Sequence, residues 1–276
     1  MAKARRTTGD ASTSSPDVAP DTAAVPTGGP TRATRAQAAV ALLVFAVLFI
    51  AESVFVYTRQ SATVDEPVHV ADGYFSLARA DYRVDPEHPP LLRMWAALPL
   101  LFEPVRSDAS TIDATSPDRW AIVDLFNDTH RFLYRQNDAD RLLFRARFMI
   151  VLLGVALGGL LFAWIDEWLG VWPACVALAM VALEPNLVAH YSVVTTDGGL
   201  TTFAFGAVYV LWRICRRGPA PLDVAWLCLF AILAVTSKYS SALLYPVVLL
   251  LLALAVFPFR RLSARRAAVI GALVLV

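Results

Sequence analysis

The stretch QAAVALLVFAVLFIAESVFVYT, residues 37–58, decides the fold class of this chain. About 20 apolar residues follow one another there with only Glu52 between them, which is the length that one helix needs to cross the hydrocarbon core of a bilayer. We expect Glu52 to face the interior of a helix bundle. The stretch as a whole predicts a transmembrane helix.

Further apolar runs follow at residues 147–165, 171–189, 198–215, 222–236 and 240–258. A last run starts near Ala267 and still continues at Val276, and about ten residues are too few for a helical crossing. We therefore expect the sequence to stop inside a seventh span, with a short interfacial end as the alternative. The sequence predicts an all-α, polytopic transmembrane helix bundle over residues 37–276, with about seven spans, the last one incomplete.

The composition excludes several other classes of protein. Hydrophobic residues make up 57% and charged residues 17%, against roughly 25% charged in an ordinary soluble domain. The 24 Lys and Arg nearly balance the 23 Asp and Glu, whereas a nucleic-acid binder usually carries a basic excess. The three cysteines lie in apolar runs without a C-x-x-C pair, which is typical of small buried side chains and indicates neither a disulfide framework nor a metal site.

The short segments outside the spans predict the orientation in the membrane. Residues 1–36 are rich in Ser, Thr, Pro and Gly without periodicity, which predicts a disordered tail. Positive charge favours the cytoplasmic side of short loops, and with a cytoplasmic N-terminus the inner side receives three basic clusters. These clusters comprise Lys3, Arg5, Arg6, Arg32 and Arg35, then Arg213, Arg216 and Arg217, then Arg260, Arg261, Arg265 and Arg266. Residues 59–146 then form a large outer loop.

This outer loop contains two expected helices. Pro67 suits the first position of a helix over residues 67–80, and Asp65 and Glu66 lie at its cap. An apolar face is predicted from residues at three- and four-residue spacing, namely Val68, Ala71, Phe75 and Ala78. The apolar run over residues 91–102 carries Arg93 and is short for a crossing. We expect both helices to be amphipathic and to lie along the outer membrane surface.

The topology brings the unusual polar residues to one side of the membrane. On the outer face or at outer ends of spans lie Asp65, Glu66, His69, His88, Arg93, Glu184, His190, Asp197 and Lys238. Ionisable groups beside apolar helices are energetically expensive and more often mark a site than a lipid-facing surface. Taken singly, each has a simpler interpretation as a helix cap, a helix-initiating turn or a lysine that reaches the interface.

The order of these residues resembles the GT-C membrane glycosyltransferases. The elements are Asp65-Glu66, His88-Pro89-Pro90-Leu91, Arg147-Phe148, Pro185-Asn186 through His190, Thr195-Thr196-Asp197 and Ser237-Lys238-Tyr239. The likeness is closest to glycosyltransferase family 39, which contains the protein O-mannosyltransferases, and to the related lipid A aminoarabinose transferases. It covers residues from about 40 to the end, and relatives of this type continue through several more spans.

The resemblance implies a role for each matching residue. Asp65 takes the place of the catalytic base, with Glu66 beside it. Arg147 matches a contact to the donor phosphate, and His88 matches a position near the donor that is basic or polar in the family. The remaining positions implied in substrate binding are His190, Asp197 and Lys238.

The implied activity is that of a hexosyl or pentosyl transferase that moves a sugar from a polyprenyl-phosphate carrier to an acceptor hydroxyl on the outer face. Direct attack with one base, Asp65, predicts inversion at the anomeric carbon. No glycine loop for a nucleotide is recognisable, because Gly158-Gly159 and Gly198-Gly199 lie in membrane runs. No metal-ligand spacing such as H-x-x-x-H occurs, although a divalent cation at the carboxylates stays open.

Two other functions stay open, and so does the substrate. Charged residues within spans and Pro185-Asn186 are also typical of a broken-helix transporter or flippase for a polyprenyl-linked substrate. A purely structural membrane subunit is the third interpretation. The sequence identifies neither the sugar nor the acceptor, which is a protein, a lipid or a polysaccharide. The Ala- and Arg-rich composition indicates a bacterial plasma membrane.

Overall fold

A computed structural model describes residues 31–85, 88–107, 122–257, 259 and 261–275 of the chain. The expected disordered tail lies almost wholly outside these residues. Within the described part, every regular element is a helix, as the sequence predicts. The elements before the second long helix are α1 (Arg35–Tyr57), α2 (Glu66–Arg79), α3 (Leu91–Ala97), η1 (Leu98–Phe102), α4 (Ile122–His130) and the π-helical turn η2 (Arg131–Gln136). The later elements are α5 (Ala139–Leu169), α6 (Val171–Ala182), α7 (Pro185–Tyr191), α8 (Asp197–Arg217), α9 (Pro221–Val235), η3 (Tyr239–Leu243), α10 (Leu244–Val256) and α11 (Ala264–Leu275).

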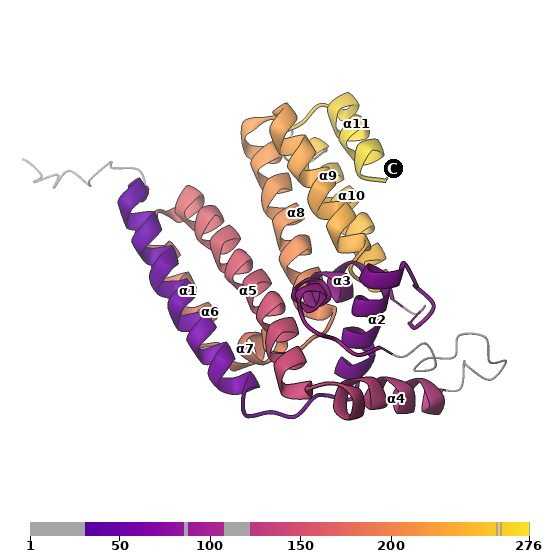
Figure 1. Ribbon diagram of the computed structural model, residues 1–276. Helices are drawn as coiled ribbons and strands as arrows, with labels where there is room; N and C mark the ends of the chain where they lie inside the picture. The colour runs from indigo at the N-terminus through magenta and orange to yellow at the C-terminus, as the bar shows by residue number, and fades with distance from the viewer. Residues whose placement is uncertain (1–30, 86–87, 108–121, 258, 260, 276) are drawn as a thin grey trace, which may run out of the picture.

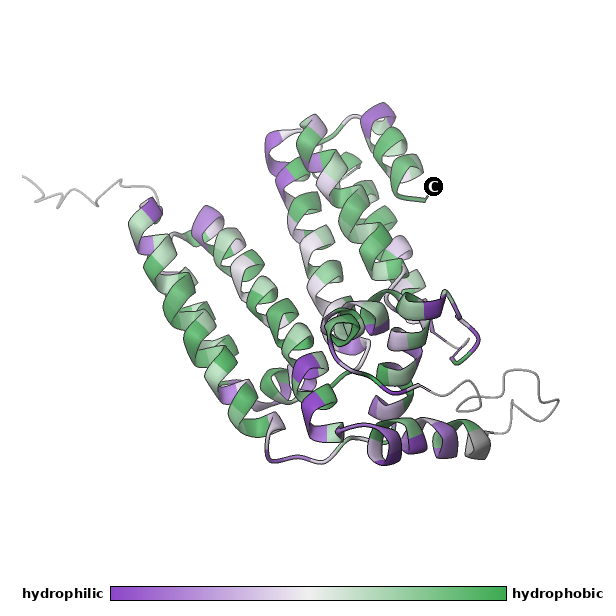
Figure 2. Cartoon of the chain, in the orientation of Figure 1, coloured by the Kyte–Doolittle hydropathy of each residue, from purple (hydrophilic) through white to green (hydrophobic). Residues whose placement is uncertain are grey.

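The long helices run roughly side by side, and four short helices lie towards one end of the bundle (Figure 1). Helices α1, α5 and α6 form one group, α8 to α11 form another, and α5 packs against α8. The short helices α2, α3, α4 and α7 lie towards the end at which α1 finishes and α5 begins. Polar residues concentrate at the ends of the long helices and in the short helices, while the middle sections are apolar (Figure 2).

Among the residues that the structure describes, four helical segments are long and apolar enough to cross a membrane. They are Arg35–Tyr57, Ala139–Leu169, Asp197–Arg217 and Tyr239–Val256, and the bent pair of α6 and α7 is a fifth if it is one span. The predicted span over residues 222–236 is present as α9, which has only 15 residues. The chain is therefore a polytopic helical membrane protein.

The apolar run over residues 171–189 folds as two helices, because α6 and α7 meet at a bend of 66°. Pro185 is the first residue of α7, and a proline favours an extended backbone at the residue before it. Glu184 adopts that conformation, and its side chain accepts a hydrogen bond from the backbone N–H of Asn186 at 3.1 Å. The helix therefore ends and starts again in a new direction.

Helix α2 begins and ends one residue earlier than expected and is buried on more than one side. Of the predicted apolar face, Val68, Ala71 and Phe75 are buried and Ala78 is exposed. Ala80 has a φ of 51°, a left-handed conformation that ends the helix. The placement of α2 and α3 along a membrane surface stays a prediction.

Two glycines bring α3 into close contact with its neighbours. A Cβ atom on Gly73 of α2 would lie 2.1 Å from the carbonyl oxygen of Arg93, and one on Gly199 of α8 would lie 2.2 Å from the Leu92 side chain. Both approaches are possible only without a side chain at the glycine. Helix α3 therefore packs closely against α2, and its Leu92 side chain reaches the backbone of α8 at Gly199.

Candidate active site

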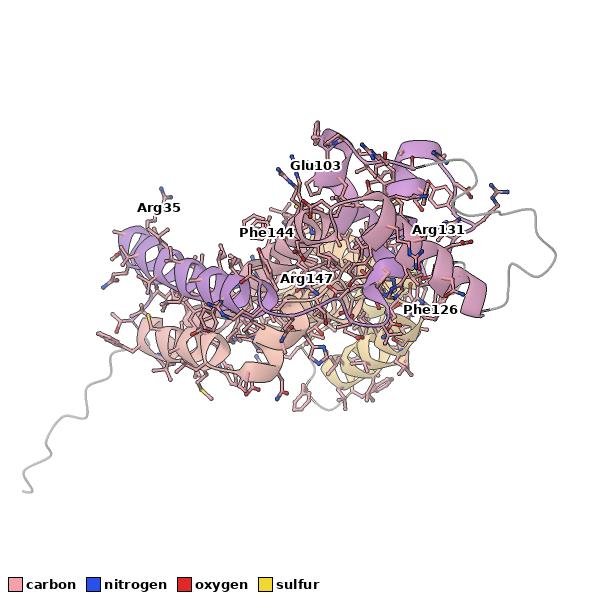
Figure 3. All side chains as sticks on the ribbon, turned by 60° about the horizontal axis from the view of Figure 1, so that its bottom comes forward. Arg35, Glu103, Phe126, Arg131, Phe144 and Arg147 are labelled. Carbon is pink, nitrogen blue, oxygen red and sulfur yellow. The ribbon has the colours of Figure 1, made fainter. Side chains whose placement is uncertain are left out.

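The predicted site residues lie at the end of the bundle where α1 finishes. They occur at the first residues of α2 and α8, in the first turns of α5, in α7 and in the turn after α9. The opposite end carries a separate ion-pair cluster, in which Arg213 bonds to Asp223 at 3.1 Å and Arg217 bonds to Glu167 at 2.7 Å. Figure 3 looks towards the first end and shows Arg147 near its centre, while Arg35 stands apart at the far tip of α1.

Glu66 and Arg147 form a buried ion pair between α2 and α5. The Nε–H of Arg147 donates to Oε1 of Glu66 at 2.7 Å and an Nη2–H donates to Oε2 at 2.6 Å. Neither side chain is more than 2% exposed. Two parallel charge-assisted bonds of this kind fix both the distance and the orientation of the two groups.

The other N–H groups of Arg147 are also used. The Nη1 atom donates to the carbonyl oxygens of Tyr57 and Gln60 at 2.8 and 3.1 Å, and Nη2 donates to that of Ser61 at 3.0 Å. These carbonyls belong to the end of α1 and the turn that follows it. A contact between Arg147 and a donor phosphate, which the resemblance implies, would require at least one of these bonds to break.

Glu66 also holds the segment that leads into α8. Its Oε1 accepts a hydrogen bond from the backbone N–H of Val194 at 2.8 Å, and its Oε2 accepts one from the N–H of Thr63 at 2.8 Å. Burial alone would raise the pKa of Glu66, but these hydrogen bonds and the charge of Arg147 outweigh it and hold the pKa below its ordinary value. Glu66 is therefore an ionised, fully bonded carboxylate.

Asp65, directly before Glu66, is in the opposite situation. It is the N-cap residue of α2, yet its side chain makes no capping hydrogen bond and is exposed. Within the described part of the chain, its carboxylate accepts no hydrogen bond and forms no ion pair. Asp65 is thus a free carboxylate, held in place by the bonded residue beside it.

His88 lies close to His69 of α2, near a buried cluster of charged groups. The two imidazole rings are 6.0 Å apart between centroids, and their Nδ1 atoms lie 3.9 and 3.7 Å from Oδ2 of Asp85. The same Oδ2 lies 2.5 Å from Nη1 of Arg93, which is also 3.1 Å from Oδ2 of Asp72. His88 therefore shares Asp85 with His69 and Arg93.

Burial and neighbouring charges shift two pKa values in this cluster. Burial, together with the positive charge of Arg93, lowers the pKa of His69 to about 4, so this imidazole is neutral at pH 7. Burial raises the pKa of Asp72 to about 6 despite the attraction of Arg93, and the nearby Asp85 adds to this shift. His69 therefore binds a proton less readily than an exposed histidine, and Asp72 binds one more readily than an exposed aspartate.

Asp197 and Lys238 form an ion pair at the junction of α8 and the turn after α9. Nζ of Lys238 lies 2.6 Å from Oδ1 of Asp197, and the two side chains are 28% and 50% exposed. The backbone N–H of Leu91 donates to the carbonyl oxygen of Thr236 at 3.3 Å, which joins the His88 segment to this turn. The pair is therefore accessible and next to the segment that carries His88.

Together these contacts form a closed ring of segments. Glu66 bonds to Val194, three residues before Asp197; Asp197 pairs with Lys238; and the turn before Lys238 bonds to Leu91. His88, three residues before Leu91, faces His69, whose backbone N–H bonds to the carbonyl of Asp65 at 3.0 Å. His190 is exposed on α7, and within the described residues no hydrogen bond or ion pair connects it to the ring.

A family model named for dolichyl-phosphate-mannose-protein mannosyltransferase matches residues 139–276, half of the chain. The chain belongs to this mannosyltransferase family. It is therefore a membrane glycosyltransferase of a class that uses a lipid-linked sugar donor. No curated protein and no solved structure gave a match.

Some of the predicted site residues lie within the part of the chain that matches the family, and the others lie before it. The matched part of this mannosyltransferase-family chain contains Arg147, His190, Asp197 and Lys238. The three remaining predicted residues precede the match, but three contacts connect their segments to it. Glu66 bonds to Arg147 and Val194, and the His88 segment bonds to Thr236 through Leu91.

The site of this mannosyltransferase-family member contains two acids to which the sequence reasoning gave no role. Asp72 lies three residues after His69, and Asp85 lies three residues before His88. The first spacing places Asp72 on the same side of α2 as His69, which is a signal that the sequence did contain. Within the described ranges, no three His, Cys, Asp or Glu side chains are arranged to hold a metal ion.

Proposed function

We propose that the chain transfers a sugar from a polyprenyl phosphate to an acceptor hydroxyl, with inversion at the anomeric carbon and with Asp65 as the general base. The observation that carries the proposal is the contrast between Asp65 and Glu66. Glu66 is buried and fully bonded, whereas the Asp65 carboxylate is exposed and unbonded within the described residues. A general base needs a fixed backbone and a free carboxylate, and this pair supplies both.

The reaction requires one proton acceptor and a stabilised leaving group. The acceptor oxygen attacks the anomeric carbon while its proton moves to Asp65, and the bond between that carbon and the phosphate oxygen breaks. The phosphate leaves with the electron pair. One displacement from the face opposite the phosphate inverts the anomeric centre.

Lys238 and His88 are the groups proposed to contact the donor phosphate. Lys238 is partly exposed, so its ammonium can donate to a phosphate while Asp197 keeps the side chain oriented. His88 is also partly exposed. Arg147 is assigned a positioning role in this proposal, because its N–H groups already hold Glu66 and the turn before α2.

The proposal places the site on the outer face of a plasma membrane, with the N-terminus in the cytoplasm. The basic residues outside the spans support this orientation, because positive charge favours the cytoplasmic side of short loops. A lipid-linked donor would then reach the site sideways from the outer leaflet. His190 stays a predicted substrate contact, and the acceptor is a protein, a lipid or a polysaccharide.

The test is a transfer assay with the full-length protein in membranes. Purified protein is given a radiolabelled sugar on a polyprenyl phosphate or on a nucleotide, with a library of hydroxyl acceptors. We expect transfer from the polyprenyl phosphate alone and a product of inverted anomeric configuration. Transfer from the nucleotide sugar, or retention of configuration, would overturn the proposal.

A second candidate function is transport of a polyprenyl-linked substrate. The 66° bend between α6 and α7 favours it, since broken helices line the substrate sites of many transporters. Against it, the predicted site residues gather at one end of the bundle and do not lie at mid-depth. Movement of a fluorescent polyprenyl phosphate across proteoliposomes, without any transfer, would favour transport.

A further inference from the structure

Arg93 on α3 is bonded to both ends of the segment that carries His88. Its Nη1 donates to the carbonyl oxygen of Asp85 at 2.9 Å, and its Nη2 donates to the carbonyl oxygen of His88. The guanidinium is only 2% exposed. One side chain thus fixes the backbone at residue 85 and at residue 88.

The same guanidinium also fixes the acid that faces the imidazole. Nη1 lies 2.5 Å from Oδ2 of Asp85, and this oxygen is 3.9 Å from Nδ1 of His88. Asp72 supports the arrangement from α2, because its Oδ1 accepts a hydrogen bond from the backbone N–H of Asp85 at 3.2 Å. The backbone carbonyl of His88 and the carboxylate nearest its imidazole are therefore both bonded to Arg93.

We propose that Arg93 is a positioning residue, which holds the His88 imidazole in place for the donor by bonding to the backbone carbonyls of Asp85 and His88 and to the Asp85 carboxylate. The inference rests on the proposed function, which makes His88 a donor contact. A lysine would keep the positive charge of Arg93 but lacks the planar fork that reaches two carbonyls and a carboxylate together. The effect of a substitution at Arg93 should consequently appear through His88.

The kinetic test compares Arg93→Lys, His88→Ala and the double variant in the full-length protein. We expect Arg93→Lys to raise the KM for the polyprenyl-phosphate sugar about tenfold, since charge-assisted hydrogen bonds are lost, with kcat close to wild type. The double variant should be no worse than His88→Ala alone, because Arg93 acts through His88. If the two single effects multiply in the double variant, the proposal is overturned.

A chemical test gives a result that does not depend on activity. His88 is modified with diethyl pyrocarbonate in membranes, and the rate is followed by mass spectrometry of the peptide that carries it. We expect faster modification in Arg93→Lys than in wild type, and no change in Arg83→Lys, an exposed arginine paired with Asp81. An unchanged rate in Arg93→Lys would overturn the inference.

Asp72→Asn serves as the second variant if Arg93→Lys does not fold. It removes one charged partner of Arg93 and keeps the shape of the side chain, so His88 should again be modified faster than in wild type. The same rate as wild type would contradict the positioning role. A failure of the proposed function has a different outcome, because the wild-type protein would then transfer no sugar from the polyprenyl phosphate.

Discussion

Glu66 and Arg147 stabilise the junction of α1, α2 and α5 because each neutralises a charge that would be expensive to bury alone. Both side chains are almost completely buried, and together they bond to Tyr57, Ser61 and Val194. Removing one partner of such a pair leaves the other as an uncompensated buried charge, which is strongly destabilising. The pair fixes the backbone at the start of α2, directly beside Asp65.

Glu66→Gln should therefore lower the free energy of unfolding by about 3–5 kcal/mol, because Arg147 would keep its charge without a charged partner. The measurement is thermal unfolding of the purified protein in detergent. Asp140→Asn is the matched control, since Asp140 lies exposed in the first turn of α5 and should leave the midpoint unchanged. Equal midpoints for Glu66→Gln and the control would show that the pair is unimportant for the fold.

The sequence indicates the individual site residues better than their partners. The resemblance implies the acidic pair and Arg147, but it does not imply that Glu66 and Arg147 bond to each other across 81 residues of sequence. Nothing local to either residue specifies that contact, which depends on how α2 packs against α5. In the cluster around Asp72 and Asp85, the spacing of His69 and Asp72 is visible in the sequence, but the contacts of Arg93 with both acids are not.

At the scale of elements, helices α2 and α3 are in direct backbone contact, because Gly73 has no side chain between them. The carbonyl of Arg93 occupies the space that a Cβ atom would need. Apolar periodicity predicts α2 and a short apolar run predicts α3, but neither pattern predicts this close approach. The break between α6 and α7 is different, because Pro185 is visible in the sequence and already favours a broken helix there.

Gly73→Ala should displace α3 and destabilise the protein by about 1–3 kcal/mol, because backbone atoms of Arg93 have to move. Thermal unfolding measures the effect, and donor KM should rise as well. Gly159→Ala on α5 is the control, since a Cβ atom there meets no atom within 4 Å and alanine favours a helix. Equal stability of both variants would contradict the close packing of α2 and α3.

At the scale of the whole molecule, the bundle has two chemically different ends. One end carries the ring of segments from Asp65 to Lys238, and the other carries Arg213 and Arg217 with their acidic partners. Apolar runs predict the helices that connect the ends, and the arginines predict which end faces the cytoplasm. The sequence does not predict the ring of segments, because the contacts that close this ring join parts of the chain that are far apart in sequence.

Orientation can be tested by labelling single cysteines. In a chain whose three native cysteines are replaced by alanine, Asp140→Cys marks the site end and Ser263→Cys marks the opposite end. An impermeant maleimide added to intact cells should label Asp140→Cys, and should label Ser263→Cys only after the membrane is opened. The reverse pattern would place the site in the cytoplasm and contradict the proposed orientation.

The most direct measurement is sugar transfer from a polyprenyl phosphate by Asp65→Asn in the full-length, membrane-inserted protein. Asparagine keeps the size of the side chain but cannot take up the acceptor's proton, so the rate should fall by about 10²–10⁴, while Asp140→Asn should transfer at the wild-type rate. Both variants should melt like the wild type, because the Asp65 side chain makes no hydrogen bond within the described residues. A stable Asp65→Asn protein that transfers sugar at the wild-type rate would contradict the account.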